Sequence, residues 1–249
     1  MNPEEQWLLE EKFGGVESEA FHADLVLLQS GTPLAYLIGS IPFLGSTIYL
    51  DSHPLIPRTE TEFWTEKAIA AIRQDVRPDV HVLDLCAGSG AIGVAIAKSL
   101  PEIQVDFAEI DLVHLPTIQK NIKYNLSEYS NRLEYSVYES DLFENVKEKK
   151  YDFILTNPPY IDPEIDRAES SVKLHEPHLA LYGGTDGMEC ITKIIKRAPA
   201  HLTPHGQLWI EHEPEQSKEI AVFAKKHGFS SLAYKDQYDV ERYSVLKLL

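Results

Sequence analysis

From residue 80 to the end of the chain, short apolar segments alternate with segments of helical periodicity. Runs such as "VHVLDL" (80–85), "IQVDFAEI" (103–110) and "YDFILT" (151–156) have the length of strands, whereas "AIGVAIAKSL" (91–100) has the helical pattern. Near-continuous apolar strands joined by helices are typical of a parallel sheet covered on both faces. The pattern therefore predicts an α/β fold with a doubly wound, mostly parallel sheet.

The same pattern predicts the remaining elements of a seven-stranded sheet. Helices are expected at 115–125, 187–200 and 215–227, and strands at 133–138, at 206–210 and twice more near the end. The first 30 residues have helical periodicity, "IPFLGSTIYL" predicts two short strands around a Gly-Ser turn, and a helix with Thr59 or Thr61 as its cap follows. We expect a short helical and hairpin appendage at residues 1–52 and one main domain at 53–249.

Charge and cysteine content limit the partners and the compartment. Lys and Arg number 23 and Asp and Glu 39, so the formal charge is −16, which opposes broad binding to nucleic acid. A protein partner is the better expectation. Only Cys86 and Cys190 occur, the acidic N-terminus does not resemble a signal peptide, and no long apolar stretch could span a membrane. These features predict a cytoplasmic protein, and the histidine spacing predicts no metal site.

Chemically suitable groups follow four successive predicted strands. The first strand leads into "LDLCAGSGAIG", where Gly88 and Gly90 allow a sharp turn and Asp84 could hold loop amides or a ligand ammonium group. Such a turn can also do no more than pack a helix on a strand. The second strand ends at Glu109, 21 residues after Gly88, the spacing at which nucleotide-binding sheets place a carboxylate on a ribose; Asp111 is the alternative.

The third and fourth loops complete the set. Asp141 in "ESDLF" could accept from an adenine amino group with Leu142 against the ring, and the fourth strand ends in "NPPY", Asn157 to Tyr160. Ligands in open α/β sheets bind at the carboxyl ends of the strands, so we expect all four loops around one site.

The order "LDLCAGSG", Glu109, "SDLF", "NPPY" resembles the class I S-adenosylmethionine-dependent methyltransferases, which have a Rossmann-like seven-stranded sheet. The segments "GTPLAYLIGSIPFLG", "LIPRTETE", "NPPYIDPE", "HEPHLALYGGTDGM" and "IEHEPEQ" resemble in particular the HemK-type family, the peptide chain release-factor glutamine methyltransferases. The resemblance runs from about Gly31 to Arg242. Leu142 stands where relatives often carry an aromatic residue, Glu213 where they usually carry glycine, and the N-terminal docking region is shorter than usual.

The resemblance implies S-adenosyl-L-methionine as the cofactor and a protein as the substrate, most simply the peptide chain release factor. We expect the enzyme to be a monomer. It assigns the methionine side of the cofactor to Cys86, Ala87, Gly88, Ser89 and Gly90, the ribose to Glu109, and adenine to Asp141 and Leu142. With Asp84, predicted above from its place in the turn, and Asn157, these are the expected cofactor-binding residues. It places the target glutamine against Asn157, Pro158, Pro159 and Tyr160, with Arg58 and Glu176 near the substrate.

The chemistry of the "NPPY" turn is consistent with an amide substrate. An amide nitrogen is a poor nucleophile, so it must be held in line with the methyl group while its hydrogens are engaged elsewhere. The side-chain carbonyl of Asn157 and the backbone carbonyl of Pro158 offer two acceptors, and the prolines carry no competing N–H. Tyr160 offers a flat face. Asn157, Pro158 and Tyr160 are the predicted catalytic residues.

Three rival functions remain open from the sequence. A sister enzyme would methylate a glutamine of a large-subunit ribosomal protein, with only the docking surface changed. A nucleic-acid amino methyltransferase acting on adenine or guanine would keep "NPPY" but should show a basic face or a recognition insert. A non-catalytic binding module could keep the fold alone.

Overall fold

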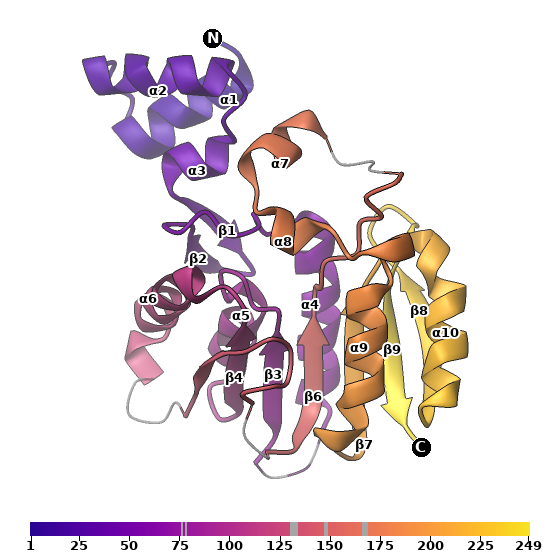
Figure 1. Cartoon of the computed structure of the whole chain (residues 1–249). Helices are drawn as coiled ribbons and strands as arrows, with labels where there is room; N and C mark the ends of the chain where they lie inside the picture. Colours follow the sequence, from indigo (N-terminus) through magenta and orange to yellow (C-terminus); the bar gives the residue numbers. More distant parts are fainter. Residues whose placement is uncertain (76, 78, 130–133, 147–148, 166–168) are drawn as a thin grey trace.

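The computed structural model describes residues 1–75, 77, 79–129, 134–146, 149–165 and 169–249. Its centre is a seven-stranded sheet in the order β5-β4-β3-β6-β7-β9-β8 (Figure 1). The first five strands of that order are parallel, and β9 is antiparallel to both of its neighbours. The strands are β3 (His81–Leu85), β4 (Gln104–Glu109), β5 (Val137–Glu139), β6 (Tyr151–Thr156), β7 (Leu202–Glu211), β8 (Phe229–Lys235) and β9 (Glu241–Leu248). The predicted α/β fold with a mostly parallel sheet is confirmed.

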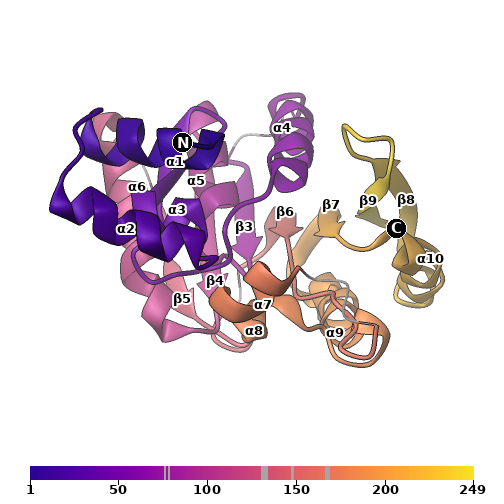
Figure 2. The same ribbon diagram turned by 90° about the horizontal axis from the view of Figure 1, so that it is seen from above.

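Helices cover both faces of this sheet, as the view from above shows (Figure 2). One face packs on α4 (Thr59–Arg73), α5 (Ala91–Ser99) and α6 (Leu115–Asn125), and the other on α9 (Glu189–Arg197) and α10 (Ser217–Lys226). Successive strand residues point to opposite faces: Val82 belongs to the first core and Leu83 to the second. Two buried faces explain why the strands read as continuous apolar runs.

Some predicted boundaries were wrong. The strand expected at 133–138 is the three-residue edge strand β5, which begins at Val137; Leu133 lies outside the described residues. The helix expected at 187–200 is α9, followed by a 3₁₀ turn at Ala198–Ala200, where Pro199 cannot donate to a continuing α-helix. Neither Thr59 nor Thr61 caps α4, because the N-cap position is Arg58 and no side chain caps it.

The N-terminal region has a small core of its own. It contains α1 (Pro3–Trp7), a π-helical turn (Leu8–Lys12), α2 (Glu19–Gln29), α3 (Leu34–Ile38) and the hairpin β1 (Ser40–Phe43) and β2 (Ser46–Tyr49). The helices bury one another's apolar residues, namely Leu8, Leu9, Phe21 and Leu37. The hairpin predicted from "IPFLGSTIYL" is confirmed.

The hairpin is attached to the main domain by two asparagines of α6. The Asn125 Oδ1 atom accepts from the Thr47 amide at 2.9 Å, and Asn121 Oδ1 accepts from the Tyr49 amide at 2.8 Å. Their side-chain nitrogens donate to the carbonyls of the same two hairpin residues. The two side chains therefore satisfy the edge of β2 as a neighbouring strand would. Ile48 of the hairpin packs into the core under α4 and α5.

Short helices lie over the carboxyl ends of the parallel strands (Figure 1). They are α7 (Ser170–His175), α8 (His178–Leu181) and single turns at Leu112–His114, Thr185–Gly187 and Pro214–Gln216. A further turn at Ser127–Tyr129 follows α6 directly. The Ser171 hydroxyl of α7 donates to the Gly31 carbonyl at 3.0 Å, so this layer contacts the N-terminal helices. In the described part of the chain, no helix has both the length and the apolar character needed to cross a membrane.

Candidate active site

Four loops meet at the carboxyl edge of the sheet, because β5, β4, β3 and β6 are parallel neighbours. They enclose a cavity of about 260 Å³, here called the glycine-loop cavity. Residues from all four predicted loops line it: Cys86, Gly88, Glu109, Asp141, Leu142, Asn157 and Pro159. The structure thus brings together in space residues that the sequence places up to 73 positions apart.

The loop after β3 exposes only part of its length to this cavity. Gly88 has a φ of +55°, and a Cβ atom there would meet no other atom within 4 Å, so the backbone at this position faces open space. Cys86, also at positive φ, lines the cavity beside it. The other loop residues assigned from the sequence, Ala87, Ser89 and Gly90, are buried behind this wall.

Asp84 lies beneath the loop and holds the start of α5. It is fully buried, and its Oδ2 accepts from the Gly93 amide at 2.8 Å, so it holds a backbone amide, one of the two functions predicted for it. Burial raises the pKa of its carboxyl well above the usual range, and the bond from Gly93 only partly opposes this. Its other oxygen, Oδ1, has no partner among the described residues.

Glu109 connects two of the loops through its carboxylate. Oε2 accepts from the Gly88 amide at 2.7 Å, and Oε1 accepts from the Asp111 amide at 2.9 Å. The side chain is 6 % exposed and lines the cavity. Asp111 has a local role besides, because its Oδ1 accepts from the Val113 amide and caps the turn at Leu112–His114. Glu109 therefore fixes the glycine loop and presents a carboxylate to any ligand there.

The opposite side of the cavity combines an acid with an apolar wall. Asp141 is exposed, and Leu142 is buried at a φ of +51° with its side chain in the core under α9. Both line the glycine-loop cavity, together with Ile110. A carboxylate for hydroxyl groups, a second acid and an apolar wall beside a bare glycine backbone suit a nucleoside with a cationic extension, so the donor set fits S-adenosylmethionine.

Asn157 lies at the end of β6 and forms part of two cavities. One is the glycine-loop cavity, and the other, of about 470 Å³ and here called the Arg58 cavity, is also lined by Arg58 and Tyr160. The Asn157 Nδ2 atom donates to the Thr61 hydroxyl at 3.2 Å. Pro158 is buried, and Pro159 faces the glycine-loop cavity. The two cavities thus meet at a single amide side chain of the predicted catalytic turn.

A buried carboxylate supports this turn from behind. Glu211, at the end of β7 and 1 % exposed, accepts from the Thr61 hydroxyl and from the Trp64 indole at 2.6 Å each. Its second oxygen accepts from the Tyr160 hydroxyl at 3.0 Å. Burial raises the pKa of Glu211, whereas hydrogen bonds from Thr61, Trp64 and Tyr160 lower it. Burial and the neighbouring Glu211 charge raise the pKa of the Tyr160 phenol well above its usual range.

These supporting residues were missed in the sequence. Thr61 and Trp64 lie three residues apart and so share a face of α4, a spacing readable from "TETEFW". Glu211 is an acid at the end of a strand, the criterion that identified Glu109. Thr61 and Glu211 are 150 residues apart in the chain, and only the structure shows that they are hydrogen-bonded to each other.

Arg58 and Glu176 form an ion pair at the edge of the Arg58 cavity. The Arg58 guanidinium donates to Glu176 Oε1 at 2.6 Å, and Oε2 accepts from the Ile56 amide at 3.0 Å. The Glu176 side chain is only 2 % exposed, whereas that of Arg58 is 33 % exposed. Arg58 therefore faces the cavity and Glu176 holds it from behind.

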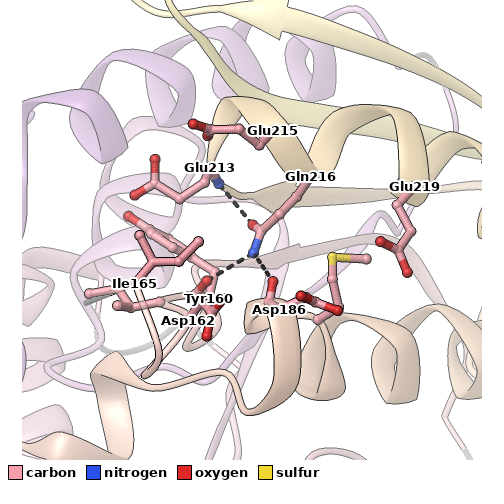
Figure 3. A pocket seen from close by; sticks show the side chains of 10 residues that line it. Tyr160, Asp162, Ile165, Asp186, Glu213, Glu215, Gln216 and Glu219 are labelled. Carbon is pink, nitrogen blue, oxygen red and sulfur yellow. Dashed lines mark hydrogen bonds between the residues drawn. The ribbon is translucent and has the colours of Figure 1, made fainter. Parts of the chain in front are cut away.

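A third cavity, of about 440 Å³, also has Tyr160 in its wall (Figure 3). It is here called the acidic cavity because its lining includes Asp162, Asp186, Glu213, Glu215 and Glu219. Gln216 is buried in its wall, donating to the Tyr160 and Asp186 carbonyls at 2.9 and 3.0 Å and accepting from the Glu213 amide. Gly187 (φ +67°) packs so closely that a Cβ atom would lie 1.9 Å from the Tyr160 carbonyl oxygen. Gly187 therefore packs directly on the backbone of Tyr160, and no larger side chain would fit at position 187.

Comparisons with known proteins show what this chain is similar to. A family model described as "Methyltransferase small domain" matches residues 67–173. A protein of Borreliella burgdorferi named "Release factor glutamine methyltransferase" is 35 % identical over 228 residues, covering 91 % of this chain and 76 % of that protein. A protein of the same name from Rhodopirellula baltica is 39 % identical over 202 residues, covering 80 % of this chain and 67 % of that one.

Two further matches bear on the substrate and the fold. A "Ribosomal protein uL3 glutamine methyltransferase" of Bradyrhizobium diazoefficiens is 32 % identical over 186 residues, covering 72 % of this chain and 57 % of that protein. The solved structure of the T. thermophilus 16S rRNA N2 G1207 methyltransferase with AdoMet and guanosine has a TM-score of 0.55. It is 20 % identical and covers 84 % of this chain and 49 % of that chain, so it supports the fold alone.

Proposed function

The chain belongs to the release factor glutamine methyltransferase family, and on that premise we propose that it methylates the side-chain amide nitrogen of a glutamine in a peptide chain release factor. S-adenosylmethionine supplies the reaction with a methyl group carried on a positively charged sulfur. The amide nitrogen of the acceptor forms the new bond to this methyl carbon while the carbon–sulfur bond breaks and its electron pair stays on sulfur. One amide proton then leaves to water.

The observation that carries this proposal is the position of Asn157 between two cavities. The glycine-loop cavity suits the cofactor, and the Arg58 cavity takes the acceptor side chain. Asn157 then meets the acceptor where the two ligands approach each other. Its Nδ2 donates a hydrogen bond to the Thr61 hydroxyl, so Oδ1 is the atom that accepts a hydrogen bond from the amide N–H of the substrate glutamine. Holding a weak nucleophile in line accounts for most of the rate enhancement.

We assign the remaining residues by their positions. The Pro158 carbonyl accepts the second amide hydrogen, and the Tyr160 ring lies against the planar amide. Glu109 binds the ribose hydroxyls, and Asp141 and Leu142 contact adenine. Arg58 binds the acceptor backbone or side chain next to the glutamine, with Glu176 holding the guanidinium.

The partner is a protein, because a chain of formal charge −16 has little attraction for nucleic acid. Residues 1–52 form the docking region for it, and the enzyme acts in the cytoplasm as a monomer. A glutamine of ribosomal protein uL3 is the second candidate acceptor, because the uL3 relative acts on the same functional group and differs in its protein partner.

The test is incubation with methyl-labelled S-adenosylmethionine and, separately, a release factor, ribosomal protein uL3 and a duplex oligonucleotide, followed by peptide mapping of the label. We expect label on one glutamine of the release factor, none when that glutamine is replaced by glutamate, and labelling about a hundredfold or more slower when Asn157→Ala is used. Label on uL3 alone would change the acceptor, and label on adenine or guanine would refute the proposal.

A further inference from the structure

One buried group behind the active site has no place in the reaction described so far. Glu211 makes three side-chain hydrogen bonds, and all three donors belong to the helix α4 or the turn after β6. A carboxylate that is 1 % exposed is costly to bury unless it is bonded in this way. Two of its donors lead directly to the first and last residues of the Asn157–Tyr160 turn.

The first of these connections determines which way the Asn157 amide faces. A hydroxyl has one hydrogen, and that of Thr61 points to Glu211 Oε2, with 2.6 Å between the oxygens. Toward Asn157, the same hydroxyl oxygen can therefore only accept. The group that meets it must be the Asn157 NH₂, and this nitrogen lies 3.2 Å away. The carbonyl oxygen Oδ1 is then the end of the amide available for other bonds.

The second connection acts on the other end of the turn. The Tyr160 hydroxyl donates to Glu211 Oε1 at 3.0 Å. Trp64, which is fully buried, also donates to Oε2 at 2.6 Å and keeps that oxygen aligned with Thr61. One carboxylate thus holds both Asn157, through Thr61, and Tyr160.

We propose that Glu211 and Thr61 are positioning residues that select the orientation of the Asn157 amide, so that its carbonyl faces the acceptor glutamine. This inference rests on the proposed function. In the opposite orientation the Asn157 NH₂ would face the acceptor NH₂, and two donors form no hydrogen bond. The acceptor nitrogen would then turn out of line with the methyl group.

The negative charge of Glu211 adds a second effect. Hydrogen bonds in a chain polarise one another. The carboxylate makes the Thr61 hydroxyl oxygen a stronger hydrogen-bond acceptor. The stronger bond from Asn157 Nδ2 to this oxygen polarises the Asn157 amide and increases the electron density on Oδ1. The amide of the substrate glutamine becomes positively charged as it is methylated, and the electron density on Oδ1 stabilises that charge.

The test uses pairs of isosteric substitutions on one helix. Thr61→Val removes the hydroxyl and keeps the side-chain volume, and we expect kcat to fall tenfold to a hundredfold with the Kd for S-adenosylmethionine within threefold of wild type. Thr61→Ser restores the hydroxyl and should bring kcat back to within about threefold. The control is Thr65→Val, because Thr65 is fully buried one turn along α4 and its hydroxyl has no partner among the described residues. Thr65→Val should leave kcat unchanged.

A double-mutant cycle separates positioning from general destabilisation. In an Asn157→Ala background, Thr61→Val should lower kcat by less than twofold, because the residue on which it acts is gone. Glu211→Gln removes the charge but keeps one accepting oxygen for Thr61 and Trp64, so it should lower kcat by less than Thr61→Val does. A full tenfold or greater loss from Thr61→Val in both backgrounds would overturn the proposal, as would equal losses from Thr61→Val and Thr65→Val.

A measurement without any acceptor keeps this inference separate from the proposed function. In protein with ¹⁵N-labelled asparagine, one side-chain amide proton of Asn157 should exchange with water at least tenfold more slowly than those of exposed Asn2. Thr61→Val should remove that protection, and Thr65→Val should keep it. Fast exchange at Asn157 in the wild-type protein would overturn the proposal. Failure to label any glutamine, with protection intact, would refute only the assigned reaction.

Discussion

Glu109 offers the sharpest test of the cofactor site, because one carboxylate makes two loop contacts and lines the cavity. Its oxygens accept from the amides of Gly88 and Asp111 at 2.7 and 2.9 Å. Glu109→Gln keeps one accepting oxygen and replaces the other with an NH₂ group, which cannot accept from the second amide. Glu109→Ala removes both acceptors.

The expected losses follow from the number of bonds removed. A hydrogen bond to a charged group contributes about 1.5–3 kcal/mol. At Glu109, part of this energy stabilises the folded protein and part stabilises the bound cofactor. The glutamine variant loses about one such bond, so its affinity for S-adenosylmethionine should fall about tenfold. The alanine variant loses the ribose contact and both loop contacts, and its affinity should fall about a hundredfold, since about 1.4 kcal/mol corresponds to tenfold.

Calorimetric titration with S-adenosylmethionine measures these affinities, and urea unfolding of the free protein measures the loop contribution. The matched control is Asp111→Asn, which changes a neighbouring acid that mainly caps its own turn. Its affinity should stay within threefold of wild type. Unchanged affinity in Glu109→Ala would refute the assignment of the glycine-loop cavity to the cofactor. A large loss of affinity in Asp111→Asn alone would assign the ribose contact to Asp111 instead.

Three other expectations concern the surroundings of the site. Arg58→Gln should raise the KM for the protein substrate about tenfold with cofactor affinity unchanged, because Arg58 lines the cavity assigned to that substrate and is not among the residues of the glycine-loop cavity; an unchanged KM would contradict that assignment. Burial lowers the pKa of His212 to about 4, so the unfolded state binds a proton that the native state does not as the pH falls below 6.5. Stability present at pH 7 should therefore fall by about 3 kcal/mol on acidification toward pH 4, and urea titrations of His212→Gln should show a smaller pH dependence. Gly187→Ala should lower kcat at least tenfold by displacing Tyr160, whereas equal turnover in the two proteins would show that the loop can adapt.

Much of the fold was readable in the sequence because its strands are buried on both faces. Continuous apolar runs such as residues 151–156 have a clear signature, and the residues that follow them fall at one edge by topology alone. β5 was predicted too long because it pairs only with β4 at the edge of the sheet, where apolar character does not mark the end of pairing.

At the candidate active site, the errors and omissions had a common cause in distant partners. Thr59 or Thr61 was expected to cap α4, since threonine near a helix start usually bonds a neighbouring amide. Thr61 shows why that expectation was wrong. Its hydroxyl instead donates to Glu211, a better acceptor that only the folded chain brings within 2.6 Å. Glu176 likewise could be linked to the substrate region from the sequence, but that it holds Arg58 from behind could not.

The separation of the two cavities at Asn157 has a consequence for the order of events in a catalytic cycle. The cavities share Leu55, Asn157 and Ala180, and otherwise have different walls. On the proposed assignment of the two cavities, we therefore expect each ligand to exchange while the other stays bound. Spent cofactor can be replaced while a bulky protein stays docked, and the docked protein can depart while a fresh cofactor waits. A steady-state pattern of random arrival and departure, with both ligands bound at the moment of transfer, is the kinetic behaviour that this partition permits.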